Sequence, residues 1–436
     1  MTRAPSMTSD ERATKAPRQT QVGIVGAGPA GLLLSHLLHL AGVDSVVLET
    51  RSRAEIEATL RAGVLEQGTV DLLRECGLGD RMLREGFVHQ GIELLFDGSR
   101  HRIDLVELTG GRAITIYPQH EVIRDLVKAR VDVGGRILFE VRDVEALDFD
   151  SSHPRLRYKL AGVSRELSCD YVAGCDGFHG VCRQTIPAAA RTEYTRSYPF
   201  GWFGILVRAA PYSKELVYAH HKRGFSLVST RSATVQRLYL QCGPTDHTDA
   251  WGDERIWAEL DERLSTHAGW PLPRGEIFQK GVIAMRSFVL EPMTYGTLYL
   301  AGDAAHIVPP TGAKGLNLAV ADVQVLAAAF AERYATGKSS ALDRYSSTAL
   351  ERVWAAEHFS WWMTSMLHQF PDSDAFGYRM QRAQLAKVIG STALQTALAE
   401  QYVGSPLPGT AAYRKVSSSR GRSRASVDRA ASAADT

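Results

Sequence analysis

The stretch QVGIVGAGPAGLLLSHLLHL, residues 21–40, decides the fold of this chain. Its apolar start predicts a short strand at 21–25, and its leucine-rich end predicts a helix at 32–40, with a glycine-rich turn between them. Residues 45–48, SVVL, predict a second strand that ends at Glu49. A strand, a helix and a second strand within about 30 residues indicate a βαβ unit of the Rossmann-like kind.

Three glycines of the turn, Gly26, Gly28 and Gly31, are spaced as in a dinucleotide-binding loop. Such a loop needs a tight turn at the first glycine, close approach to a pyrophosphate at the second, and close helix packing at the third. The pyrophosphate then lies at the positive N-terminus of the helix. Glu49 follows at the distance expected of an acceptor for ribose hydroxyls. These features favour a dinucleotide site over a purely structural turn.

Two later segments indicate which dinucleotide binds. Residues 168–180, SCDYVAGCDGFHG, and residues 298–318, LYLAGDAAHIVPPTGAKGLNL, each predict a strand that runs into a glycine-containing loop. Asp303 can hold the ribityl chain of a flavin, although alone it also suits a helix cap. The start of the next helix can offer backbone N–H groups to the flavin ring. Its residues are Lys314, Gly315, Leu316 and Asn317. Together the segments favour tightly bound FAD over NAD.

The order of elements predicts an α/β (α+β) two-domain flavoprotein. A Rossmann-like FAD-binding domain is followed by a substrate domain with a mixed, largely antiparallel sheet, and helices dominate the C-terminal region. The predicted parts are a disordered extension (1–19), the FAD-binding domain (20–197, with part of the substrate sheet inserted near 92–118), the substrate-binding domain (198–297), a flavin-contacting and helical region (298–412) and a disordered tail (413–436).

Charge and composition limit the partners of the chain. Its 436 residues include 50 Lys and Arg against 48 Asp and Glu. Residues 1–19 carry +2 and residues 411–436 carry +4, so the body between them carries −4. Nucleic acid needs clustered basic surface, so we expect no such partner. Charged and polar residues interrupt the longest apolar stretches, so we expect no membrane span.

The cysteines and the N-terminus bear on the compartment. The five cysteines are odd in number and are not spaced as metal-ligand pairs. The first residues lack the apolar core of a secretory signal. We therefore expect a cytoplasmic protein with free thiols and no bound metal.

Several motifs carry a resemblance to a known family. They are RAGVLEQG (61–68), CDGFHG (175–180), YPFGW (198–202), STRSAT (229–234), GDAAHIVPPTGAKGLNLA (302–319) and FSWWMTSMLH (359–368). On these motifs the chain resembles the single-component flavin monooxygenases that hydroxylate aromatic rings, and within them the branch that acts on 4-hydroxybenzoate. The similarity covers everything except the two tails.

This resemblance implies an activity. NADH or NADPH would reduce FAD, O2 would add to the reduced flavin, and the flavin hydroperoxide would transfer oxygen to the ring carbon beside a phenol. The product would be 3,4-dihydroxybenzoate (protocatechuate). The resemblance also implies a homodimer that forms through the helical region at 298–412.

The resemblance assigns roles to individual residues. For the substrate, the matching residues are Ser229, Arg231 and Tyr239 at the carboxylate, Tyr218 and the carbonyl of Pro310 at the phenol, Tyr402 as a proton relay and His89 at the solvent end of that relay. For the flavin, they are Arg61, Gln119, Arg237 and Asn317, and for the nicotinamide nucleotide Arg61, His179 and Arg286.

The chemistry of the reaction makes these residue types reasonable. A planar carboxylate in a closed pocket favours the forked donors of an arginine such as Arg231. An electrophilic oxygen needs an electron-rich ring, so the phenol must lose its proton through a hydrogen-bonded path. Taken singly, however, Tyr218 or Tyr239 is more typical of a tyrosine that packs on a sheet.

The sequence departs from the family pattern after the second strand. Members selective for NADPH have basic and aromatic side chains there, including an arginine where Thr59 stands. Glu55 and Glu57 would repel a 2′-phosphate, whereas Arg51 and Arg53 would attract one. Relaxed selectivity or a preference for NADH is therefore our hypothesis.

Two other functions stay open at this point. The same scaffold could act on a related phenolic or amino benzoate. In a different class, the chain could be a nucleotide-responsive binding protein that uses a Rossmann unit without turnover.

Overall fold

The computed structural model describes residues 17–59, 61 and 63–407. The tail predicted at 413–436 and most of the extension predicted at 1–19 lie outside the described residues. Gln19 already forms a parallel β-bridge with Ser168. The folded part therefore includes the last residues of the predicted extension.

The predicted βαβ unit forms the centre of a mainly parallel sheet. In spatial order its strands are β18 (Thr294–Tyr295), β19 (Leu298–Leu300), β12 (Tyr171–Gly174), β1 (Val22–Val25), β2 (Ser45–Leu48) and β8 (Arg136–Leu138). β1 pairs in parallel with β12 on one side and with β2 on the other. All residues of β1 and β2 are buried, because strands covered on both faces are apolar throughout.

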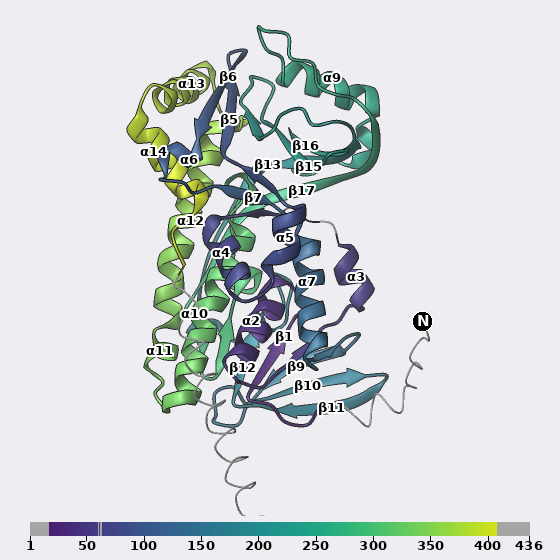
Figure 1. The fold of residues 1–436 in the computed structure, drawn as a ribbon, viewed down its shortest axis with the longest axis vertical. Helices are drawn as coiled ribbons and strands as arrows, with labels where there is room; N and C mark the ends of the chain where they lie inside the picture. The colour runs from purple at the N-terminus through teal and green to yellow at the C-terminus, as the bar shows by residue number, and fades with distance from the viewer. Residues whose placement is uncertain (1–16, 60, 62, 408–436) are drawn as a thin grey trace, which may run out of the picture.

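Helices cover this sheet and complete the lower half of the molecule in Figure 1. The three principal ones are α2 (Pro29–Leu40), α7 (Gln119–Asp132) and α10 (Gly315–Thr336). α7 and α10 both pack against α2. α10 is long and apolar enough to cross a membrane, but 72% of its most apolar window is buried inside the protein. We therefore interpret α10 as a core helix of this half.

A larger sheet forms the second half. In spatial order its strands are β20 (His306–Ile307), β17 (Glu276–Glu291), β13 (Thr192–Arg208), β16 (Val235–Cys242), β15 (Ser226–Ser232), β14 (Leu216–Ala219), β5 (Gly91–Phe96) and β6 (Ser99–Asp104). The pairs are antiparallel except for β14 with β5. β5 and β6 come from the segment predicted to be inserted near 92–118.

The insertion differs from the prediction at its end. Residues 114–116 form β7 (Ile114–Ile116), which does not join the larger sheet. It pairs instead with β3 (Val64–Leu65) and β4 (Phe87–His89), beside the flavin-site segments. The alternation of apolar residues predicted a strand there, but it could not predict the partner strands.

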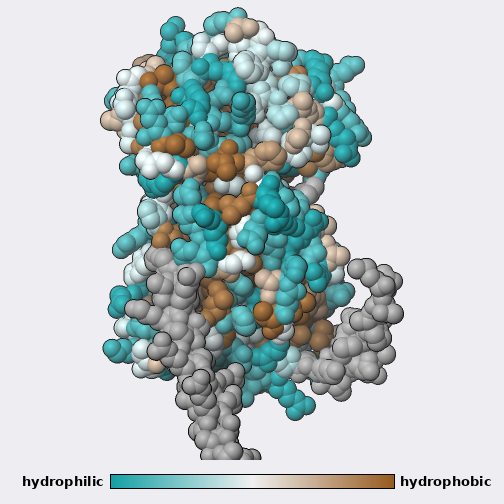
Figure 2. Space-filling view, in the orientation of Figure 1, coloured by the Kyte–Doolittle hydropathy of each residue, from teal (hydrophilic) through white to brown (hydrophobic). Residues whose placement is uncertain are grey.

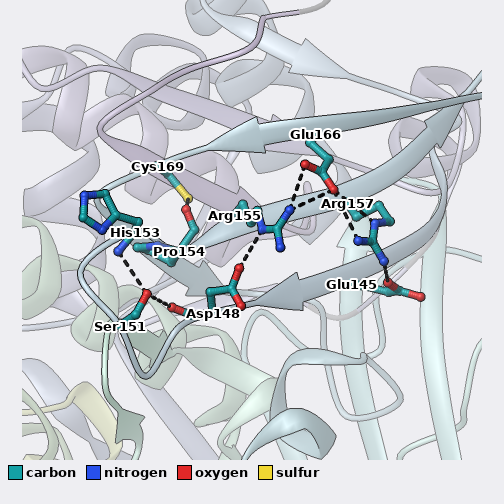
Figure 3. A network of polar contacts seen from close by, with 9 residues as sticks. All are labelled: Glu145, Asp148, Ser151, His153, Pro154, Arg155, Arg157, Glu166 and Cys169. Atoms are coloured by element: carbon teal, nitrogen blue, oxygen red, sulfur yellow. Dashed lines mark hydrogen bonds and ion pairs between the residues drawn. The ribbon is translucent and has the colours of Figure 1, made fainter.

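A further antiparallel sheet was not predicted. Its strands are β9 (Arg142–Leu147), β10 (Arg155–Leu160) and β11 (Val163–Ser168). Figure 3 shows a ladder of alternating charges across it, in which Arg155 and Arg157 both bind Glu166. Arg157 also pairs with Glu145. These ion pairs are exposed, so they keep the outer face of this sheet polar and contribute little to stability.

The remaining helices surround the two sheets. They are α3 (Arg53–Ala58), α4 (Gln67–Glu75), α5 (Gly79–Glu85), α6 (Leu105–Leu108), α8 (Cys182–Thr185), α9 (Asp253–Arg263), α11 (Ser340–Asp343), α12 (Tyr345–Leu367), α13 (Ala375–Ile389) and α14 (Thr392–Val403). Of the C-terminal helices, α11 lies beside the lower half in Figure 1, and α13 and α14 lie beside the upper half. Short 3-10 turns include η3 (Gly302–Ala304) and η4 (Pro310–Gly312). Figure 2 shows apolar atoms where the two halves meet on this face.

Candidate active site

The glycine-rich turn has the geometry that its three glycines predicted. Gly26 has φ +100°, and a Cβ there would lie 2.3 Å from the carbonyl oxygen of Cys175. A Cβ on Gly31 would lie 2.0 Å from the carbonyl oxygen of Gly26. A Cβ on Gly28, by contrast, would meet nothing within 4 Å. Gly26 and Gly31 therefore serve the packing, and Gly28 leaves open space for a phosphate group.

The start of α2 is free to bind an anion. Gly28 is its N-cap, no side chain caps the helix, and its first turn has no acidic residue. The carboxylate of Glu49 lies at the end of β2 beside this turn and accepts the N–H of Ala27 at 2.7 Å. Its other oxygen accepts the N–H of Arg51 at 2.9 Å. Glu49 is thus fixed next to the turn, where the sequence places a ribose.

The second flavin segment lies in the loop after β19. Gly302 has φ +64° and donates its N–H to Asp322 at 2.9 Å. The side chain of Asp303 is 48% exposed and lies 3.9 Å from Arg61. The carboxylate of Asp303 is therefore available to a ligand.

The start of α10 presents uncapped N–H groups, as the motif predicted. Its N-cap, Lys314, gives no side-chain cap. The side chain of Asn317 is fully used by the protein, since its oxygen accepts from Glu66 and Thr69 and its nitrogen donates to Val64. Asn317 thus ties the segment 64–69 to the helix, and both of its side-chain N–H groups are already used by the carbonyls of Val64 and Ala313.

Glu66 is a residue of this region that the sequence analysis missed. Its carboxylate forms a buried ion pair with Lys314 at 2.6 Å, and Lys314 also donates to the carbonyl of Tyr402 at 3.2 Å. The ion pair links the flavin segment, α10 and α14. Glu66 belongs to the motif RAGVLEQG, but nothing in that motif indicates a distant lysine partner.

Arg61 and Gln119 come from segments that touch. The N–H of Tyr117 donates to the carbonyl of Gly63 at 2.9 Å. A Cβ on Gly63 would lie 2.8 Å from the backbone nitrogen of Gln119. Open space at Gly28, the exposed Asp303 and two uncapped helix starts together fit FAD.

The two residues expected at the nicotinamide nucleotide share one neighbour. The ring of His179 lies 5.1 Å from the ring of Phe178, edge to face. The guanidinium of Arg286, on β17, lies 4.9 Å from the same ring. The structure therefore places both predicted residues against the ring of Phe178.

Paired strands bring the predicted carboxylate-binding residues together. Ser229 on β15 lies opposite Arg237 on β16, with Arg231 and Tyr239 each two positions away on these strands. The Ser229 hydroxyl, Arg231 Nη1 and Arg237 Nε are buried without a hydrogen-bond partner. Within the described residues, neither arginine forms an ion pair with a carboxylate. Such unpaired donors indicate a site for an anionic ligand.

The two predicted tyrosines form a direct pair. The hydroxyl groups of Tyr218, on β14, and Tyr402, on α14, are hydrogen-bonded, and both side chains are buried. Burial raises the pKa of both hydroxyls. The Tyr402 ring lies 6.1 Å from Phe359 of α12, and α12 packs against η4, which begins at Pro310. The predicted relay pair is therefore assembled from two separate segments, β14 and α14.

His89 does not lie where the sequence analysis expected it. It was predicted at the solvent end of the relay, but its side chain is 1% exposed and Nδ1 has no hydrogen-bond partner. Burial, and then the nearby charge of Arg231, lower its pKa to about 4. Among the described residues, no hydrogen bond joins His89 to Tyr402. In this conformation His89 is a neutral group close to the arginine.

Further polar groups around the site were missed as well. The Nε2 of His306 lies 2.6 Å from Asp322, the acceptor of the Gly302 N–H. The indole N–H of Trp202 donates to His368 at 2.7 Å. Trp202 and His368 occur in the motifs YPFGW and FSWWMTSMLH, but their pairing spans two distant segments. Asp322 could have been found from the sequence, because an acid within an otherwise apolar helix indicates a buried carboxylate that needs a partner.

Comparison with known proteins gives a consistent result. The model of the FAD binding domain family matches residues 19–360. The chain is 46% identical over 388 residues to p-hydroxybenzoate hydroxylase of Acinetobacter baylyi, which covers 89% of this chain and 96% of that protein. It is 28% identical to 3-(3-hydroxy-phenyl)propionate/3-hydroxycinnamic acid hydroxylase 2 of Burkholderia vietnamiensis, over 71% of this chain and 56% of that protein.

Solved structures share the fold. The p-nitrophenol 4-monooxygenase of Pseudomonas putida DLL-E4 superposes with a TM-score of 0.76 at 20% identity, over 89% of this chain and 100% of that chain. Aklavinone-11 hydroxylase, solved as a ternary complex with FAD and aklavinone, superposes with a TM-score of 0.67 at 22% identity, over 80% and 69% of the two chains. The predicted two-domain flavoprotein fold is confirmed.

The buried state of His89 predicts a pH dependence of stability. Its folded pKa of about 4 is below the ordinary value of 6.5, so the unfolded chain takes up the proton first as the pH falls. The contribution of His89 to the free energy of unfolding is therefore fully present above pH 6.5 and is lost as the pH falls toward 4. His89→Asn should remove up to about 3 kcal/mol of this loss. Urea unfolding across the window measures it, and equal slopes for both proteins would contradict the prediction.

Proposed function

We propose that this chain, which belongs to the FAD binding domain family of flavin-dependent aromatic hydroxylases, hydroxylates 4-hydroxybenzoate at the 3-position. The single observation that carries the proposal is that the paired strands β14, β15 and β16 carry two polar groups of different chemistry. The unpaired donors of Ser229 and Arg231 suit a carboxylate, and the hydroxyl pair of Tyr218 and Tyr402 suits a phenol. The 46% identity to a p-hydroxybenzoate hydroxylase supports the same substrate.

The residues of the chain have distinct tasks in this reaction. Reduction by NADH or NADPH and activation of O2 are the chemistry that FAD supplies when it is bound. Arg231 and Ser229 bind the carboxylate and fix the orientation of the ring. Tyr218 hydrogen-bonds the phenol, and the Tyr218–Tyr402 pair relays its proton toward water, each hydroxyl taking up one proton as it gives up another, so the phenol becomes an electron-rich phenolate. Burial of these groups excludes water from the reacting centre.

We place the enzyme in the cytoplasm as a homodimer formed through the helical C-terminal region. Large apolar side chains are exposed on α12 and α13, and they support a protein contact there. They include Trp361, Phe376 and Met380.

A related phenolic or amino benzoate is the second candidate substrate, because a carboxylate and a polar ring substituent satisfy the same two polar groups.

We further propose that the enzyme uses NADH at least as well as NADPH. Arg51 is bound to Glu49 at 3.1 Å, and Arg53 is bound to Glu57 at 2.6 Å. The carboxylate of Glu55 accepts the N-cap N–H of α3. Both cations beside the expected 2′-phosphate are therefore paired with carboxylates already, which supports a site without phosphate selectivity.

The proposed activity predicts a coupled reaction. The purified protein should be yellow, and 4-hydroxybenzoate should accelerate NADH or NADPH oxidation and yield 3,4-dihydroxybenzoate. A panel of hydroxy- and aminobenzoates with product analysis separates the true substrate from an effector that only stimulates coenzyme oxidation. If 4-hydroxybenzoate neither accelerates oxidation nor is hydroxylated, the proposal fails. A protein that stays colourless after addition of FAD would favour a nucleotide-responsive binding protein.

The two ends of the pocket should respond differently to mutation. Arg231→Ala should weaken 4-hydroxybenzoate binding by about 100-fold, because a buried charge-assisted pair is lost. Tyr218→Phe should keep binding within about tenfold while product formed per coenzyme oxidised falls, because the relay is broken. Titration of flavin absorbance and product analysis measure the two quantities. Equal affinity losses with normal coupling in both variants would contradict the assigned roles.

The coenzyme proposal makes its own prediction. The kcat/KM for NADH should equal or exceed that for NADPH, and Thr59→Arg should raise the value for NADPH by about tenfold through a new phosphate contact. Thr59→Gln is the matched control, because it adds length without charge. A strict requirement for NADPH in the wild type would overturn the proposal.

A further inference from the structure

His368 is a buried histidine, and its neighbours determine which of its two ring nitrogens carries the proton. It follows α12 directly and is fully buried. Its Nε2 lies 2.7 Å from the indole nitrogen of Trp202, and its Nδ1 lies 3.0 Å from the carbonyl oxygen of Thr364. An indole N–H can only donate, so Nε2 accepts and the proton is on Nδ1, which donates to the carbonyl. The ring therefore joins β13 to the end of α12.

Aromatic rings connect His368 to both ends of the substrate pocket. The Trp202 ring lies 4.8 Å from Tyr239, at the carboxylate end. The Phe225 ring lies 4.3 Å from His368 and 6.2 Å from Tyr218, at the phenol end. Each pocket tyrosine thus packs on a ring that packs on His368.

The same segment supports the loop that carries Pro310. The hydroxyl of Thr364 lies 2.8 Å from the hydroxyl of Thr311, the residue after Pro310. Gln241 of β16 clamps the end of α12, because its side-chain oxygen accepts the N–H of both Phe225 and Gln369. The end of α12 is thereby held against the sheet and against the loop at once.

We propose that His368 is a positioning residue that sets Tyr239 relative to Tyr218 through Trp202 and Phe225. Its role is to hold the carboxylate end and the phenol end of the pocket at the separation that a single-ring hydroxybenzoate needs. It does not contact the substrate itself. The inference rests on the proposed function, whose site it deepens.

The test replaces His368 while keeping its ring or one hydrogen bond. His368→Phe retains a ring for the stack but leaves the Trp202 N–H without an acceptor, so the Kd of 4-hydroxybenzoate should rise about tenfold. Product formed per coenzyme oxidised should fall, while FAD affinity is unchanged. His368→Gln offers an oxygen to Trp202 and should restore most of the affinity. Trp202→Phe should weaken binding similarly, and the double variant with His368→Phe should show less than additive loss.

A matched control separates positioning from packing. His220 is also buried and bonds the end of α12, at the carbonyl of Leu367 at 3.2 Å, but its ring stacks on Tyr378. His220→Phe should leave the Kd of 4-hydroxybenzoate within about twofold of the wild type. If His368→Phe does not fold, His368→Gln and Trp202→Phe still decide the question.

The outcomes distinguish this inference from the proposed function. An active wild type with unchanged Kd and coupling in His368→Phe, or in Trp202→Phe, overturns the positioning role alone. Equal losses in His368→Phe and His220→Phe also overturn it, because they would reflect general packing. A wild type that hydroxylates no benzoate overturns the proposed function and this inference with it.

Discussion

Arg231 is half-buried, and its buried Nη1 without a hydrogen-bond partner constrains the site around it. Burial disfavours the charged form, and its pKa is lowered for that reason, with Arg237 as a second cation nearby. A charge in such a place requires an anion, and the described residues provide none. Under the proposed function, the carboxylate of the substrate supplies that anion. The sheet register that sets Ser229 opposite Arg237 delivers further donors to the same site.

A second consequence follows at the other end of the pocket. A phenol held among buried groups cannot release its proton directly to water, so it needs a hydroxyl neighbour. Tyr218 and Tyr402 supply that neighbour, although burial raises the pKa of each. Under the proposed function, a proton would pass along their hydrogen bond without either hydroxyl becoming a stable anion. Burial first, and then the charge of Arg231, lower the pKa of His89 to about 4, because two cations so close together would repel each other.

The parts of the site set by local sequence were predictable, and the parts set by packing were not. The glycine turn, Asp303 and the start of α10 depend on a few neighbouring residues, and the structure has them as expected. The partners of β7 and the burial of His89 depend on which distant strands pair. The same holds for Glu66 with Lys314 and for Trp202 with His368. Periodicity gives no information about such pairs.

Burial decides how much an arginine contributes, and the arginines at the two proposed ligand sites differ in burial. Around α3 the arginines are exposed and already paired with carboxylates, as Arg53 is with Glu57. Exposed pairs contribute little stability, so exchanging them alters coenzyme recognition with little effect on the fold. At Arg231 the cation is half-buried with Nη1 unpartnered, and under the proposed function a change there would leave the nearby buried donors of Ser229 and Arg237 without a ligand. Under the proposed function, coenzyme preference is therefore the property most free to vary, whereas recognition of a carboxylate depends on the unpartnered donors around Arg231.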